Sequence, residues 1–290
     1  MKVMSAVLTS SNLDYCRRAV ASFPDHADII IVCNSQDPFY VNEIMFSDLA
    51  ENYQIVRTTS NGMPGLGKQS VINHFLSTDY THLIQIDADD FLYSDGYDII
   101  VDTVKQHSLD VLGLLNEDIY FDHKSFTDWK RLDFIKVADR VDVSAEKAAV
   151  VKNLFNDVTD LIGQEGCFFN RMVCVSRLAA EHINYNIDMV GLEDLRASCD
   201  LKLLHLENKL KYGLVETPNI YLYFKEIAEG NSFKIMQGDV EQVRELFYTN
   251  LDHDKQDKLQ NGRLTVIEVT EKDSKFKRYR YALSHIKQYS

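Results

Sequence analysis

The stretch Leu83-Ile84-Gln85-Ile86-Asp87-Ala88-Asp89-Asp90 places three carboxylates directly after a short apolar run. The apolar run predicts a buried strand over His82–Ile86 that ends abruptly at the acidic residues. No positive charge lies within four residues of the three aspartates. Packing like charges together costs free energy unless something neutralises them, and hard cations such as Mg²⁺ or Mn²⁺ do so through oxygen ligands. The alternative is a solvated acidic turn that caps the next helix.

Other apolar segments precede this stretch and alternate with helical patterns. Strands are predicted over Val3–Leu8, Asp28–Cys33 and Tyr53–Arg57. Strands that are apolar throughout are buried on both faces, which is typical of a parallel sheet covered by helices. Ligands of such sheets bind beyond the carboxyl ends of the strands. We therefore expect the loops 9–12, 34–38 and 87–90 to meet at one edge of the sheet and to form a site there.

The rest of the chain continues the α/β pattern less regularly. The apolar spacing predicts strands at Asp110–Leu115, Cys167–Val175 and Leu264–Val269, and helices at Asp98–Gln106 and Leu192–Leu210. A loose boundary falls near Glu229-Gly230-Asn231. We expect a catalytic domain over 1–230 and a mainly helical extension with a basic tail over 231–290.

Composition and charge limit the class of protein. The 290 residues are 45% hydrophobic and 26% charged, which is ordinary for a globular chain, and the net charge is −13. That charge argues against a protein that works mainly by non-specific neutralisation of phosphates. The five cysteines are odd in number and form no C-x-x-C pair, so a reducing compartment is expected. No apolar run reaches 18 residues, so we expect a cytoplasmic, soluble protein without an integral membrane segment.

A second motif favours a different class of protein. The stretch Gly62-Met63-Pro64-Gly65-Leu66-Gly67-Lys68-Gln69-Ser70 nearly matches a phosphate-binding P-loop, and an apolar strand that ends in Asp follows it. A P-loop nucleotide hydrolase or kinase that uses Gly62–Lys68 is therefore an alternative. Against it, Gln69 stands where a Ser or Thr hydroxyl must reach Mg²⁺, and only 19 positions separate Lys68 from Asp87. In either case we expect the turn 61–67 to lead into a helix from about Lys68 to Leu76.

Taken together, the motifs resemble those of inverting GT-A glycosyltransferases of the family 2 type. Gly67–Asn73, then Thr78-Asp79-Tyr80, then Leu83–Asp90 is similar to the family's pattern G-K-x-x-A-L-N … D-Y … D-A-D-D. Three further stretches resemble the first strand with its nucleotide-binding turn, the second strand, and the later strand and helix with the E-D motif: Val3–Asn12, Ile29–Asp37 and Phe168–Arg196. Cys33 takes the place of the usual base-contacting Asp. The resemblance covers roughly residues 1–232.

The resemblance implies a fold and an activity. The fold would be α/β of the GT-A type, a Rossmann-like, mostly parallel sheet with helices on both faces, followed by a C-terminal helical extension. The activity would be transfer of a sugar from a nucleotide-diphosphate sugar, with a UDP-sugar expected, to an acceptor hydroxyl with inversion at the anomeric carbon. The acceptor would be a glycan or a hydroxylated base in DNA. A non-catalytic module that binds sugar nucleotides is a further alternative.

The resemblance also implies a role for each site residue. Asp87 and Asp89 would hold Mn²⁺ or Mg²⁺, which stabilises the charge that develops on the leaving diphosphate. Asp194 would be the base that deprotonates the acceptor, with Glu193 beside it in the catalytic pair. The residues expected to bind the substrate are Thr9, Ser10, Asn34, Asp37, Lys68, Asp87 and Asp90.

The basic residues gather at the end of the chain. The segment Lys272–Lys287 carries six lysines and arginines, and its apolar residues recur at helical spacing. An amphipathic helix docked on the catalytic domain is one interpretation. An anionic membrane surface and a nucleic-acid acceptor are the others.

Overall fold

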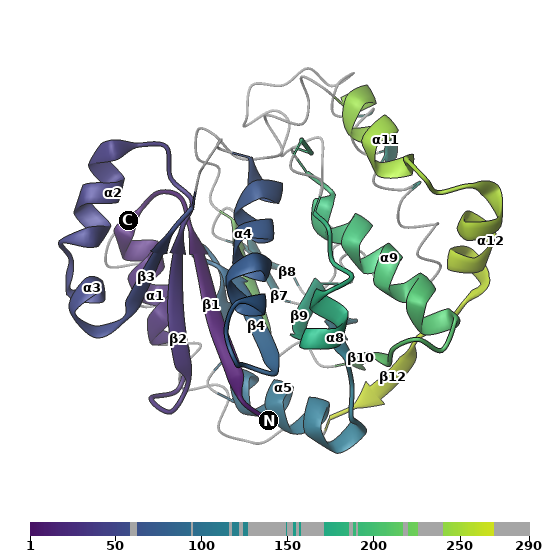
Figure 1. The fold of residues 1–290 in the computed structure, drawn as a ribbon, viewed down its shortest axis with the longest axis horizontal. Helices are drawn as coiled ribbons and strands as arrows, with labels where there is room; N and C mark the ends of the chain where they lie inside the picture. The colour runs from purple at the N-terminus through teal and green to yellow at the C-terminus, as the bar shows by residue number, and fades with distance from the viewer. Residues whose placement is uncertain are drawn as a thin grey trace.

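The computed structural model shows an α/β fold built on one large sheet (Figure 1). It describes residues 1–58, 63–93, 95–115, 118–121, 124–126, 149, 153–154, 157, 171–185, 188–189, 191–216, 220–225 and 240–269. The stretches 127–148 and 226–239, Cys167–Asn170 and the tail Lys272–Lys287 lie outside the described residues, and the expectations that fall on them stay predictions.

The main sheet has eight strands in the order β12-β10-β6-β9-β4-β1-β2-β3. Their bounds are β1 Val3–Thr9, β2 Asp28–Cys33, β3 Gln54–Arg57, β4 His82–Asp87, β6 Val111–Leu114, β9 Arg171–Ser176, β10 Tyr212–Glu216 and β12 Thr265–Glu268. All neighbouring strands run parallel except β9, which lies antiparallel between β4 and β6. The predicted strands are thereby confirmed to within a few residues, and β9 is confirmed from Arg171 onward.

Helices cover both faces of this sheet, as the doubly apolar strands predict. On one face α1 (Leu13–Ala21), α2 (Pro38–Met45), α3 (Asp48–Asn52) and α5 (Gly96–His107) share a hydrophobic core with the odd-numbered residues of β1. On the other face α4 (Pro64–Leu76), α8 (Arg177–Ala180) and α9 (Glu193–Leu206) pack on its even-numbered residues. The alternation follows from the two-residue period of a strand, so the face to which each β4 side chain points can be read from the same pattern.

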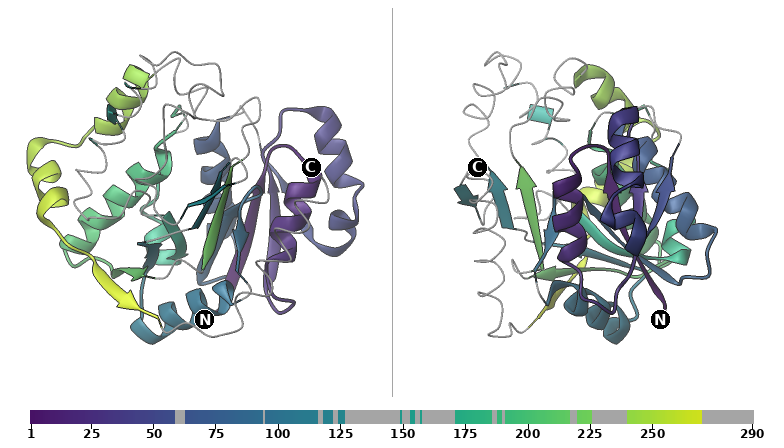
Figure 2. Two further views of the ribbon diagram at one scale, coloured as in Figure 1. Left: turned by 180° about the vertical axis from the view of Figure 1, so that it is seen from behind. Right: turned by 90° about the vertical axis from the view of Figure 1, so that its left-hand side faces the viewer.

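A second, smaller sheet lies on the α1/α5 side of the main sheet. Its strands are β5 (Phe91–Leu92), β11 (Tyr221–Lys225), β7 (Asp118–Phe121) and β8 (Lys124–Phe126), in that order. Seen from behind, it lies in front of the main sheet (Figure 2). Leu92 and Tyr221 belong to the core on that face. Because β5 follows the acidic turn directly, the second sheet borders the predicted site.

The C-terminal part of the described chain packs along α9. Helices α11 (Val240–Tyr248) and α12 (His253–Asn261) form a hydrophobic cluster with the outer side of α9 (Figure 1). The guanidinium of Arg196 donates to the Phe247 and Thr249 carbonyls at the end of α11, at 2.5 and 2.6 Å. The ammonium of Lys202, which is fully buried, donates to the Leu259 carbonyl of α12 at 2.9 Å. Cations are favourable at helix C-termini, so α9 holds both helices by their ends.

This packing bears on the expected extension over 231–290. The predicted helical character is present in α11 and α12, but β12 pairs with β10 as an edge strand of the main sheet. The residues around 230 lie outside the described part of the chain, so the boundary stays a prediction. No helix among the described residues has the length and apolar character needed to span a membrane.

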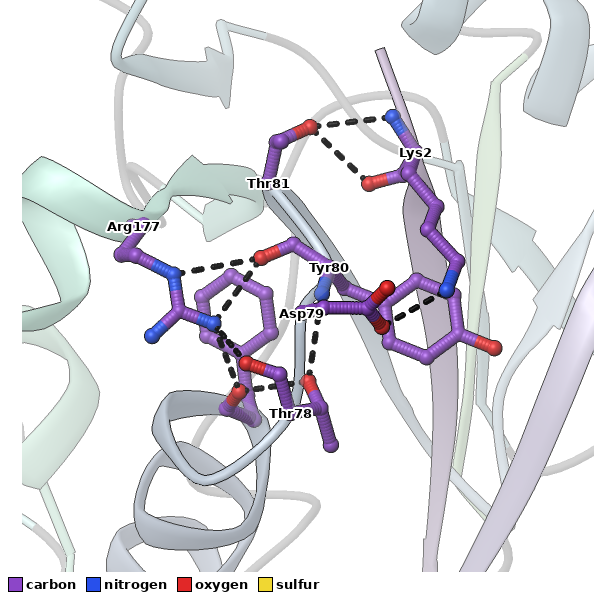
Figure 3. A network of polar contacts seen from close by, with 7 residues as sticks. Lys2, Thr78, Asp79, Tyr80, Thr81 and Arg177 are labelled. Carbon is purple, nitrogen blue, oxygen red and sulfur yellow. Dashed lines mark hydrogen bonds and ion pairs between the residues drawn. The ribbon is translucent and has the colours of Figure 1, made fainter.

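Arg177 fixes the end of α4 opposite the acidic turn (Figure 3). Its guanidinium donates to the carbonyls of Leu76 at 2.9 Å, Phe75 at 3.3 Å and Tyr80 at 3.1 Å, and also to that of Thr78. The neighbouring ion pair between Lys2 and Asp79, at 2.6 Å, is exposed. Arg177 therefore neutralises the partial negative charge at the C-terminus of α4 and ties that end of the helix to the start of α8.

Candidate functional site

The site lies where the central parallel strands end. Leu8 is in register with Asp87, and Thr9 is in register with Cys33, so the carboxyl ends of β1, β2 and β4 form one edge. The turn after β4 is closed by two backbone bonds, from the Ala88 N–H to the Leu8 carbonyl and from the Asp90 N–H to the Asp87 carbonyl. The predicted edge is confirmed, because the loops after these strands meet there.

Three carboxylates of this turn lie close together. One carboxylate oxygen from each of Asp87, Asp89 and Asp90 lies within 4.8 Å of the others. Asp87 and Asp89 are half-buried, whereas Asp90 is fully buried and accepts a hydrogen bond from the Tyr221 hydroxyl at 2.5 Å. Tyr221 therefore anchors the acidic turn to the second sheet.

The donor set suits a hard divalent cation. All three groups offer carboxylate oxygens, which Mg²⁺ and Mn²⁺ prefer over nitrogen or sulfur. Two oxygens bound to one Mg²⁺ lie at most about 4.2 Å apart, and no two oxygens of this cluster lie more than 4.8 Å apart. The partial exposure of Asp87 and Asp89 leaves room for ligands from a substrate. The cluster therefore fits the metal that the sequence predicts, with Asp90 as a third candidate ligand.

The N-terminus of α9 supplies a second pair of carboxylates on the other side of the site. Leu192 precedes the helix in the left-handed conformation, with φ 63°, and no side chain caps the helix. An N-terminal turn without a capping side chain leaves positive partial charge and backbone N–H groups for nearby carboxylates. One oxygen of Asp194 accepts the Leu195 N–H at 2.9 Å. Glu193 and Asp194 thus begin the helix at the site.

Lys68 joins these carboxylates to α4. Its ammonium donates to a Glu193 oxygen at 2.6 Å and to the second oxygen of Asp194 at 3.3 Å. The side chains of Lys68 and Glu193 are only 10% and 5% exposed, whereas that of Asp194 is 35% exposed. Of the two carboxylates, Asp194 is therefore the one that a substrate can reach. Both carboxylates contact Lys68, with Glu193 turned inward to the lysine, and their catalytic roles stay predictions.

Charge and burial act against each other at this cluster. Burial alone would lower the pKa of Lys68, but the negative charges of Asp194, Glu193 and Asp87 hold it well above its usual value. Burial raises the pKa of Glu193, and the nearby Lys68 ammonium opposes that effect. Burial also raises the pKa of the Tyr185 hydroxyl. Lys68 is therefore charged at neutral pH, and its ammonium lies next to the carboxylates of Glu193 and Asp194.

A pocket connects the acidic turn with the helix N-terminus. Its polar lining residues are Lys68, Gln85, Asp87, Tyr185 and Asp194, and the rest of its wall is apolar. The space open to water-sized molecules is about 40 Å³, which is enough for a few waters. Leu83, Gln85 and Asp87 alternate along β4, so the carboxylate of Asp87 faces the same side as α4 and α9. Asp87 and Asp194 therefore face one common space.

Four of the residues expected to bind the substrate, Thr9, Ser10, Asn34 and Asp37, differ in their surroundings. Thr9 is 1% exposed and its hydroxyl contacts that of Tyr40 in the core, on the face opposite Asp87. Ser10 is exposed next to it. Asp37 is exposed and caps α2 by accepting the Phe39 N–H. The side chains of Thr9 and Asp37 thus have structural partners, and their binding roles stay predictions.

Asn34 lies against the start of α4. Its side chain accepts a hydrogen bond from the Thr58 hydroxyl at 2.9 Å and donates to the Met63 carbonyl at 3.5 Å. A Cβ at Gly67 would lie only 2.5 Å from the amide nitrogen of Asn34. The glycine is therefore required for close packing of α4 against the second loop of the site.

The P-loop alternative is contradicted by the geometry of α4. The helix begins at Pro64 and not at Lys68, so Gly65 and Gly67 lie inside its first turns; Gly62 lies outside the described residues. Pro64 occupies the first helical position, where proline is favoured because its missing N–H is not needed. Lys68 bonds to carboxylates of α9, and the Gln69 amide oxygen accepts the Tyr185 N–H at 2.8 Å. The loop of free backbone N–H groups that a P-loop requires is absent from residues 63–70.

Two residues at the site were not found by sequence reasoning. Tyr185 lines the pocket and Tyr221 holds Asp90. Neither tyrosine belongs to a motif used in the sequence analysis. Each contacts the site only because segments far apart in the chain pack together. The sequence offers one signal for each: Tyr185 precedes the Glu193-Asp194 pair, and Tyr221 begins a Tyr-Leu-Tyr stretch.

Comparison with known proteins identifies the fold. No protein-family model matches the chain, and no curated protein matches it. Among solved structures, a fragment of TarS from S. aureus in complex with UDP-GlcNAc matches at a TM-score of 0.56 and 14% identity, over 90% of this chain and 70% of the fragment. The same fragment with UDP matches at 0.55 and 14%, over the same shares of both chains. The longer TarS structure matches at 0.53 and 13%, over 89% of this chain and 42% of its own length.

At this identity the likeness concerns the fold. The chain shares the mostly parallel α/β sheet, with helices on both faces, of a protein that binds a nucleotide sugar. The predicted fold class, a mostly parallel α/β sheet with helices on both faces, is confirmed.

Proposed function

We propose that the chain is a metal-dependent, inverting glycosyltransferase that moves a sugar from a nucleotide-diphosphate sugar to an acceptor hydroxyl. One observation carries this proposal: the carboxylates of Asp87 and Asp194, from two segments more than 100 positions apart, face one pocket at the carboxyl end of the sheet. A non-catalytic binding module does not require a second carboxylate opposite the metal cluster. The fold of TarS, which binds UDP-GlcNAc, supports the choice of donor class.

Asp194 is the proposed base. Its carboxylate is partly exposed at the N-terminus of α9, where backbone dipoles and the Lys68 ammonium favour the ionised form. It accepts the proton of the acceptor hydroxyl as that oxygen bonds to the anomeric carbon. The bond from the anomeric carbon to the diphosphate breaks on the opposite side, which inverts the configuration.

The acidic turn is the proposed site for the leaving group. Asp87 and Asp89 would hold Mn²⁺ or Mg²⁺, with Asp90 as a third ligand or as the residue that keeps the turn in place through Tyr221. The bound ion supplies positive charge next to the departing diphosphate and so stabilises the transition state. A UDP-sugar is the expected donor. A glycan, or a hydroxylated base in DNA reached by the basic tail, is the expected acceptor.

A transfer assay tests this proposal. The full chain is incubated with a panel of UDP- and GDP-sugars and with Mn²⁺ or EDTA, and release of the nucleoside diphosphate is measured. We expect release that requires the metal and falls about 10²- to 10⁴-fold in Asp194→Asn, because a general base contributes a factor of this size. Asp102→Asn, an exposed carboxylate on α5, is the matched control and should keep full activity. Metal-independent turnover, or full turnover in Asp194→Asn, would refute the assignment.

A further inference from the structure

A buried ion pair lies beside the proposed base Asp194 at the start of α9. Deprotonation of the acceptor requires only Asp194, so the pair needs its own explanation. Lys68 and Glu193 have almost fully buried side chains, and their charged atoms lie 2.6 Å apart. Breaking a buried pair is costly, yet replacing one with apolar side chains is often neutral, so such a pair is weak evidence for stability alone. The same ammonium also reaches Asp194 at 3.3 Å. One cation is therefore shared by an inaccessible carboxylate and an accessible one.

Removal of the Lys68 ammonium would change the protonation of Glu193 and Asp194. Glu193 and Asp194 are adjacent in sequence and both lie at the first turn of α9, and the charge of Asp194 raises the pKa of Glu193 through repulsion of like charges. The other groups that face this cluster are Asp87 from β4 and the Tyr185 hydroxyl from the segment before α9. Among these described neighbours, Lys68 supplies the positive charge and the others are acidic or neutral. Without it, the two carboxylates of α9 would share a proton.

We propose that Lys68 is a positioning residue for Asp194: anchored by Glu193, its ammonium keeps Asp194 ionised and fixes the direction of its carboxylate toward the pocket. This inference rests on the proposed function, because it assigns Asp194 the proton of the acceptor. Glu193 is then the counter-ion that holds the lysine in place and takes no proton itself. The proton moves from the acceptor hydroxyl to Asp194, while the Lys68 ammonium keeps its three protons throughout.

The geometry distinguishes this role from that of a lysine that binds the donor phosphates. The Lys68 ammonium is directed at α9, and two of its three N–H donors are used by Glu193 and Asp194. An ammonium aimed at a diphosphate would act mainly on the KM for the nucleotide sugar. A positioning role acts on kcat and on its dependence on pH.

A set of variants with pH profiles tests the proposal. The variants are Lys68→Met, Glu193→Gln and Lys68→Met/Glu193→Gln, with Lys105→Met, an exposed lysine on α5, as the control. In Lys68→Met we expect the acidic limb of the kcat profile to move up by about one pH unit or more. We expect kcat at neutral pH to fall at least about tenfold, with less change in the KM for the donor. The double variant also lacks the repulsion from Glu193, so its limb should lie between those of Lys68→Met and the wild type.

Each outcome of this experiment decides between the roles. An unchanged acidic limb in Lys68→Met would overturn the proposal. A rise in KM alone would overturn it in favour of a contact with the donor. If Lys68→Met does not fold, the double variant, which lacks both charges of the buried pair, is compared with Glu193→Gln. The two differ only in the ammonium, so a higher acidic limb in the double variant supports the proposal and equal limbs overturn it. Failure of the proposed function is separate, since it would be seen as retained turnover in Asp194→Asn.

Discussion

The ammonium of Lys68 lies 2.6 Å from a carboxylate oxygen of Glu193, although 125 positions separate the two residues in the chain. This ion pair joins the start of α4 to the start of α9, and both helices begin at the edge of the sheet where β4 ends. It changes the interpretation of Lys68 from a lysine of a phosphate-binding loop to a partner of the acidic residues of α9.

The first prediction concerns the pH dependence of stability in Lys68→Met. Without the ammonium, burial and the charge of Asp194 raise the pKa of Glu193 further above its usual 4.5. A carboxyl with a higher pKa in the folded than in the unfolded state binds protons on folding, so stability falls as pH rises between the two values. We expect a loss of about 3–5 kcal/mol near pH 8 and a smaller loss near pH 5. Urea unfolding at both pH values measures it, and an equal loss at both would contradict the account.

A second prediction concerns the hydrogen bond from Tyr221 to Asp90. Tyr221→Phe removes a buried donor from a carboxylate, so we expect a loss of about 1.5–3 kcal/mol in the free energy of unfolding. Because Asp90 belongs to the acidic turn, the affinity for Mn²⁺ should also fall about tenfold or more. Tyr212→Phe is the matched control, since its buried hydroxyl pairs with the neutral Ser198 hydroxyl at 2.8 Å. The control should cost about 1 kcal/mol and leave Mn²⁺ affinity unchanged; equal metal affinities in both variants would refute the anchoring role.

A third prediction uses the close contact between Gly67 and Asn34. In Gly67→Ala the new methyl group would meet the Asn34 amide at 2.5 Å, so either the amide or α4 must move. We expect a loss of about 1–3 kcal/mol in stability, as overpacking usually costs. Binding of the nucleotide sugar should weaken as well if Asn34 contacts it. Calorimetric titration of the donor with Mn²⁺ measures this, and unchanged affinity in a destabilised variant would place Asn34 outside the donor site.

A fourth prediction separates stability from activity. Arg177→Met removes donors to four carbonyls at and just after the C-terminal end of α4, whereas the site lies at the start of that helix. Figure 3 shows Arg177 beside Thr78 and Tyr80. We expect a loss of about 3 kcal/mol in the free energy of unfolding, with kcat unchanged below the unfolding transition. Lys2→Met, which breaks an exposed ion pair beside it, should leave the unfolding midpoint nearly unchanged. A large fall in kcat for Arg177→Met would show that the position of α4 is set by more than its N-terminal contacts.

Local sequence patterns predicted the strands well. Asp28–Cys33 was expected and observed with the same bounds, and His82–Ile86 differs from β4 by one residue. These segments are apolar on both faces and end at polar turns, so their burial can be read from composition. The site edge followed from the same strands, because the carboxyl ends of parallel neighbours meet.

Other features depend on contacts that no local pattern contains. The start of α4 was predicted four residues late because Gly65 and Gly67 indicate a turn, while the packing of Gly67 on Asn34 requires them inside the helix. The strands of the second sheet were not predicted, since all are short and β7 and β8 lie in a charged, aromatic stretch. The partner of Lys68 could not be predicted, because the pair forms only when α4 and α9 are placed side by side.

The most direct measurement follows the anomeric configuration of the released sugar. Proton NMR is recorded while the full chain and Mg²⁺ act on each UDP- and GDP-sugar of the panel, with water or an added acceptor hydroxyl as nucleophile. The account predicts release of the nucleoside diphosphate together with a sugar that first forms in the opposite anomeric configuration, and none in Asp194→Asn. Release with the original configuration, or consumption of no nucleotide sugar, would contradict it.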